Sequence, residues 1–133
     1  MKILSDILSA TILFSIPLLL VALGGMFSER SGVINIALEG IMVIGALCAC
    51  LTLRALDQST TIGETAPQLG MLIAILVAAV IGSLFSLLLA FASVSLKADQ
   101  TIGGTALNMM APAMAIAITW AVQGQGQTNI IIP

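Results

Sequence analysis

The sequence predicts an all-α protein, a polytopic bundle of about four transmembrane helices. Its mean hydropathy is +1.19 and only 8% of its residues are charged, whereas an ordinary soluble domain carries about 25%. Three long stretches have no charge at all: residues 7–28, 66–96 and 100–133. Each is long enough to cross a bilayer core of about 30 Å as a helix of about 20 residues. The strand-like alternation that a transmembrane barrel requires is absent.

Four membrane segments follow from this pattern, at residues 7–27, 33–53, 69–96 and 101–122. Together they form one transmembrane domain over residues 1–133. The connector between the first two, Ser28–Gly32, is so short that these segments should be antiparallel neighbours.

The first segment should be a retained helix rather than a cleaved signal peptide. Asp6 interrupts its basic start, the apolar run is too long, and residues 21–25 lack a small-residue cleavage site. Pro17, near the middle, should kink this helix because proline removes a hydrogen bond inside it.

The third segment carries a stripe of small residues with a period of four. Such a stripe allows a second helix to approach closely in lipid. The alternative is chance, since the segment is rich in alanine. The stripe consists of Ala74, Ala78, Gly82, Ser86 and Ala90.

Glu39 is the only charged residue between Ser31 and Leu53. A carboxylate at membrane depth is costly and normally faces a bundle interior or an aqueous cavity. Asn35, four residues earlier, should share its helical face. These two residues either line a solute pathway, or Glu39 holds the end of a neighbouring or broken helix by hydrogen bonding.

Asn108 is a similar polar residue in the fourth segment. Gly103, Gly104 and Pro112 surround it, and such residues allow a broken helix whose backbone lines a cavity. Asn108 is therefore a further candidate for the pathway, although an interhelical hydrogen bond is the favoured interpretation.

Several functional classes are disfavoured by composition. The chain has no histidine and no tyrosine, so the commonest metal ligand and the commonest general base are missing. No basic run is present, which argues against nucleic-acid binding. Cys48 and Cys50 lie on nearly opposite faces of one helix and cannot bind a single metal together. We expect no catalytic residue, no metal and no cofactor.

Two runs in the sequence indicate a family. Residues 17–40 read PLLLVALGGMFSERSGVINIALEG, and residues 98–108 read ADQTIGGTALN. Both resemble signatures of ABC transporter permeases for simple sugars and nucleosides, which group with the ribose and branched-chain amino acid permeases. The resemblance covers essentially the whole chain. Such permeases are about twice as long, so the chain resembles their N-terminal half, and its abrupt end at Pro133 agrees with a fragment.

The resemblance implies a permease subunit of an ABC importer for nucleosides or simple sugars, in the cell membrane. Its expected partners are an ATP-binding subunit, a second permease subunit and an extracytoplasmic solute-binding protein. The chain itself has no phosphate-binding GxxxxGK[ST] motif and should not hydrolyse ATP.

Two other functions remain open. One is a complete small four-helix transporter that uses Glu39 as a proton-coupled carboxylate. The other is a structural membrane subunit without a transport role.

Overall fold

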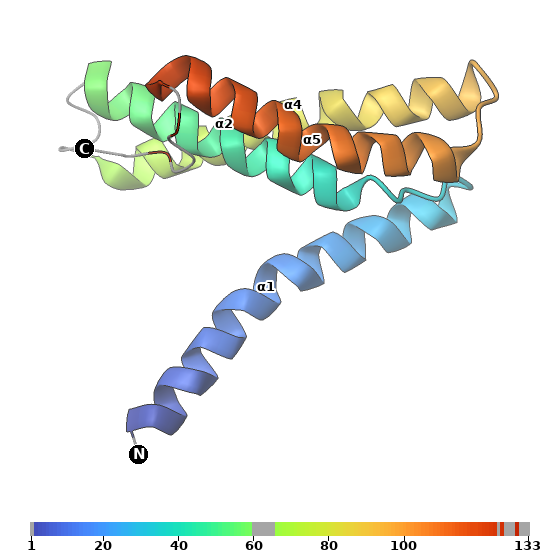
Figure 1. Cartoon of the computed structure of the whole chain (residues 1–133). Coiled ribbons are helices and arrows are strands. Elements are labelled where there is room, and N and C mark those ends of the chain that lie inside the picture. Colours follow the sequence, from blue (N-terminus) through green and yellow to red (C-terminus); the bar gives the residue numbers. More distant parts are fainter. Residues whose placement is uncertain (1, 60–65, 125, 127–129, 131–133) are drawn as a thin grey trace.

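The charge-free stretches form helices in the computed structural model, which describes residues 2–59, 66–124, 126 and 130 (Figure 1). The helices are α1 (Lys2–Arg30), α2 (Leu38–Ser59), α4 (Pro67–Val94) and α5 (Gln100–Gln123). All four are long and apolar enough to cross a membrane. No strand occurs within the described residues. The all-α transmembrane fold predicted from the sequence is confirmed.

Helices α2, α4 and α5 lie side by side, while α1 leaves them at an angle (Figure 1). Helix α4 runs antiparallel to α2 and α5, which are parallel to each other. The centre of the bundle is formed by Ile44 of α2, Phe85 of α4 and Ala111 of α5, with Cys48 packed against them. These three helices therefore form one packed unit.

The small-residue stripe of α4 lies on the inner side of this unit. Ala74 and Gly82 are buried, and no member of the stripe is exposed. A Cβ atom built on Gly82 would lie 3.5 Å from Ile41 Cγ2 of α2. On the outer side, Leu76 and Leu84 are 66% and 57% exposed. This arrangement is what small residues allow in lipid, where close backbone approach replaces water exclusion as a source of packing energy.

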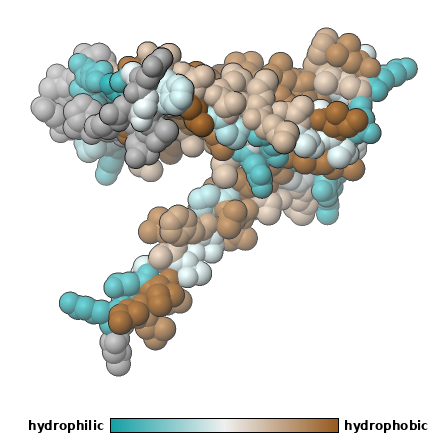
Figure 2. Space-filling model, viewed as in Figure 1, coloured by the Kyte–Doolittle hydropathy of each residue, from teal (hydrophilic) through white to brown (hydrophobic). Residues whose placement is uncertain are grey.

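Helix α1 does not pack along α2, so the expected antiparallel pair is wrong. No residue of α1 is buried. The C-terminal part of α1 approaches the start of α2, where a Cβ atom on Gly25 would lie 2.9 Å from Leu38 Cδ1. A short connector does not force two helices together, because lipid solvates apolar side chains as well as a neighbouring helix does. Figure 2 shows hydrophobic residues along α1 and over much of the bundle.

A glycine turn ends α1. The N–H of Gly32 donates to Glu29 O at 3.0 Å, and the N–H of Val33 donates to Ser28 O at 3.4 Å. This pair of bonds is the Schellman motif, which requires a left-handed residue after the helix. Gly32 supplies it with φ +87°.

The second membrane segment begins its helix later than expected. The sequence predicts a helix from residue 33, but α2 begins at Leu38, and residues 31–37 are not helical. The N–H groups of residues 31–33 bond to carbonyls at the end of α1. Further along the segment, the N–H of Ile34 and Ile36 O are bonded to side chains of α5.

Candidate functional site

The non-helical segment 31–37 runs beside the first two turns of α5. The N–H of Ile34 donates to Gln100 Oε1 at 2.8 Å, and the N–H of Gly40 donates to Asn108 Oδ1 at 2.7 Å. Gln100 and Asn108 are about 12 Å apart along the helix axis, at 1.5 Å per residue. The segment therefore enters the depth of the bundle, where irregular backbone is tolerated only if it is covered by protein or lines a cavity.

Asn108 bonds to both this segment and the first turn of α2 through the two ends of its carboxamide. Its Oδ1 accepts from Gly40, and its Nδ2 donates to Ile36 O at 2.8 Å. The hydrogen-bonding interpretation of Asn108 that the sequence favours thus agrees with its position in the structure. Asp99 supports the start of the same helix by accepting from the N–H groups of Thr101 and Ile102, at 2.8 and 3.2 Å, as an N-cap does.

Two glycines let α5 come this close. A Cβ atom on Gly104 would lie 3.0 Å from Ile36 Cβ, and one on Gly40 would lie 3.0 Å from both Asn108 Oδ1 and Leu107 O. Both glycines are buried. Their missing side chains place the two backbones within reach of the Asn108 amide.

Asn35 lies in the non-helical segment. Its Oδ1 accepts from the N–H of Ala37 at 3.1 Å, a local turn typical of asparagine. Its Nδ2 has no hydrogen-bond partner among the described residues. Ser28, at the end of α1, fixes the other side of the segment by donating from Oγ to Val33 O at 2.8 Å.

Asn35 lines an open groove of about 390 Å³ between α1, α2 and α4. Its other polar lining residues are serines, and none of the described residues that line it is charged. These serines are Ser28 of α1 and Ser83 and Ser86 of α4. The groove thus offers hydroxyl and amide groups without a fixed charge.

Glu39 does not join this groove. It lies in the first turn of α2 and is exposed, so the expectation that it faces the interior of these four helices is wrong. The shared helical face with Asn35 is also wrong, because Asn35 precedes the helix. At this position a carboxylate interacts favourably with the positive end of the helix dipole.

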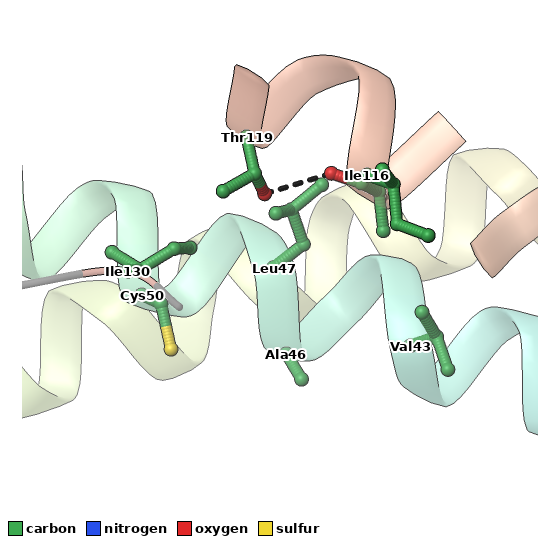
Figure 3. A pocket seen from close by; sticks show the side chains of 8 residues that line it. Val43, Ala46, Leu47, Cys50, Ile116, Thr119 and Ile130 are labelled. Carbon is green, nitrogen blue, oxygen red and sulfur yellow. Dashed lines mark hydrogen bonds between the residues drawn. The ribbon is translucent and has the colours of Figure 1, made fainter. Parts of the chain in front are cut away.

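A second pocket, of about 410 Å³, lies between residues 43–50 of α2 and residues 115–119 of α5 (Figure 3). Its lining is mostly apolar, and the hydroxyl of Thr119 is bonded to Ala115 O of its own helix at 2.8 Å. The pocket therefore offers little polar recognition, and the groove beside Asn35 is the better candidate site.

Sequence reasoning missed Gln100, Ser28 and Ser83, and it gave Ser86 a packing role only. Gln100 lies inside the second family-like run, yet nothing in that run indicates that its side chain accepts from Ile34. The roles of these residues depend on which segments lie side by side, and a short-range pattern does not contain that information.

The chain matches one protein-family model over residues 7–132, described as the permease component of the branched-chain amino acid transport system. No solved structure gives a significant match.

Curated relatives carry related descriptions. The guanosine ABC transporter permease protein NupQ of Bacillus subtilis is 45% identical over 130 residues, which cover 98% of this chain and 39% of that protein. The nucleoside ABC transporter permease protein NupC of Lactococcus lactis is 42% identical, over 93% of this chain and 37% of that protein. A putative glucose ABC transporter permease of Haloferax volcanii, TsgC13, is 33% identical, over 80% and 29%.

The chain therefore spans about two fifths of the length of the first two relatives. The family match covers nearly all of the chain, and the four apolar helices agree with a multi-pass protein of the cell membrane. The chain belongs to the family of branched-chain amino acid transport system permease components.

Proposed function

We propose that the chain forms part of a permease subunit of an ABC importer for nucleosides or simple sugars. The relatives with the highest identity given above are described as nucleoside and guanosine permeases, and another as a putative glucose permease. In such an importer the chain would act with an ATP-binding subunit, a second permease subunit and an extracytoplasmic solute-binding protein. Its own task is to form a wall of the translocation pathway.

The observation that carries this proposal is the irregular segment 31–37 beside the uncharged polar groove. The Nδ2 group of Asn35 is unbonded there among the described residues, and Ser86 adds a hydroxyl. Nucleosides and sugars are neutral and rich in hydroxyl groups, so they match hydroxyl and amide partners. The lining therefore favours a neutral polar solute.

Asn35 is the residue that we assign to the pathway in this chain. Asn108 contributes by holding the segment that carries Asn35. Glu39 is exposed on the outside of the four helices, where it can face further helices of a complete permease, and it stays a weaker candidate for the pathway.

The test is uptake by cells from which the gene encoding this chain has been deleted and then restored. Radiolabelled guanosine, ribose and leucine are offered in parallel. Loss of guanosine or ribose uptake on deletion, with recovery on restoration, supports the proposal, whereas unchanged uptake of both would contradict it. In the restored strain, Asn35→Ala should reduce uptake. Thr11→Val is the matched control, because Thr11 is exposed on α1 and bonds only to Ile7 O of its own helix.

A further inference from the structure

The carboxamide of Asn108 occupies the place of one helical hydrogen bond. In a continuous helix, the N–H of Gly40 would donate to Ile36 O, four residues earlier. Here Gly40 donates to Asn108 Oδ1, and Asn108 Nδ2 donates to Ile36 O. The next bond in the series, from the N–H of Ile41 to Ala37 O, is formed directly at 2.9 Å. The interruption therefore lies at the level of Asn108.

The local sequence alone does not require this interruption. Helices break at prolines, at glycine or serine pairs, at π-bulges, or where a side chain inserts between bonded backbone groups. Residues 33–39 contain neither proline nor glycine. Gly32 ends α1 by its left-handed turn, but that turn does not prevent a new helix from starting at residue 33. Among the causes of a break, an inserted side chain is the one that the contacts show.

We propose that Asn108 is a positioning residue that keeps residues 34–37, just before α2, out of the helix and thereby places Asn35 in the groove. Without the carboxamide, Ile36 O and the N–H of Gly40 bond to each other. Leu38 and Glu39 then donate to Ile34 O and Asn35 O, and α2 gains about one turn. Asn35 moves onto the helix, four residues before Glu39.

The neighbouring contacts permit this rearrangement. The N–H of Ile34 is bound by Gln100 Oε1, and the first N–H groups of a helix lack partners within it. Gln100 can therefore keep its bond and cap the lengthened helix. Residues 34–37 can therefore be either non-helical or part of a longer α2, and Asn108 selects the non-helical arrangement.

Hydrogen–deuterium exchange of the full-length protein in lipid nanodiscs tests this inference. In the parent, the N–H groups of Leu38 and Glu39 have no hydrogen-bond partner among the described residues, and we expect fast exchange. In Asn108→Ala they should exchange about tenfold more slowly, the factor that one to two net hydrogen bonds supply. Slower exchange after the loss of a hydrogen-bonding side chain is not expected from simple destabilisation.

Asn108→Leu, which keeps most of the side-chain volume against α2, should give the same slowing if Asn108→Ala does not fold. The matched control is Thr105→Val, because Thr105 is exposed one turn earlier on α5 and bonds only to Thr101 O. It should leave the exchange unchanged. Unchanged or faster exchange of Leu38 and Glu39 in folded Asn108 variants would overturn the inference.

The significance of Asn35 rests on the proposed transport function, but the exchange experiment does not. Failure to detect uptake would leave the result on helix unwinding intact. Conversely, normal uptake in the parent together with unchanged exchange in the variants would reject only the role of Asn108.

Discussion

The side chain of Asn108 accepts a hydrogen bond from the backbone of Gly40 at 2.7 Å across a sequence separation of 68 residues. This contact joins α5 to the first turn of α2, and its partner bond to Ile36 O joins α5 to the non-helical segment. The position of that segment, and with it the groove beside Asn35, therefore depends on a close approach of α2 and α5.

Gly40→Ala should weaken the close packing of α2 against α5. The new Cβ atom would lie 3.0 Å from Leu107 O, a backbone atom, and 3.1 Å from Ala111 Cβ. We expect a loss of about 1–3 kcal/mol in the free energy of unfolding, as for other overpacked sites, measured by thermal unfolding in detergent. Gly24→Ala is the control, because nothing lies within 4 Å of its Cβ position. Equal stability of the two variants would contradict the account.

Gly82→Leu should separate α4 from α2. A Cβ atom at this position meets Ile41 Cγ2 at 3.5 Å, which is ordinary contact, so we expect only the leucine atoms beyond Cβ to press against α2. We expect a loss of about 1–3 kcal/mol, whereas Gly82→Ala should cost little. If Gly82→Leu unfolds at the parent temperature in the same detergent, the small-residue stripe has no packing role.

Gly32→Ala should strain the turn that ends α1. At φ +87° an alanine is in a left-handed conformation that costs about 1–2 kcal/mol, and stability should fall by about that amount in a chemical or thermal unfolding series. Gly45→Ala provides the comparison, since its Cβ atom would make an ordinary contact of 3.7 Å with Ala78 O within a regular helix. A smaller loss of stability in Gly32→Ala than in Gly45→Ala would contradict the left-handed turn at Gly32.

Glu39→Gln should keep substantial solute uptake. In an ATP-driven importer the carboxylate need not gain and lose a proton, and the amide keeps its shape and hydrogen bonding. A proton-coupled transporter that uses Glu39 should lose uptake with this change, because its carboxylate must titrate. Uptake measured across a range of pH in the parent and in Glu39→Gln separates the two. A normally expressed but inactive variant, from a parent whose uptake follows the proton gradient, would contradict the ABC function.

The membrane helices could be predicted because their signal is local. The uncharged stretches set the approximate positions of α1, α4 and α5, since a bilayer requires long apolar helices. The small residues from Ala74 to Ala90 likewise indicated which side of α4 allows close packing before any partner was known.

The start of α2 could not be predicted in the same way. Residues 33–37 are compatible with a helix, and the side chains of Asn108 and Gln100, which come from a distant part of the sequence, hold them in another conformation. Helical periodicity predicted that Asn35 and Glu39 share one helix face, but α2 begins at Leu38, after Asn35. The direction of α1 was missed because a connector length does not determine packing in lipid.

The most direct test of the account is an experimental structure of the full-length permease, at a resolution that shows side-chain amides. The account predicts that α2 begins at Leu38 and that the Asn108 carboxamide bonds both Ile36 O and the N–H of Gly40. A continuous helix from residue 33, with the N–H of Gly40 bonded directly to Ile36 O and Asn108 turned elsewhere, would contradict it.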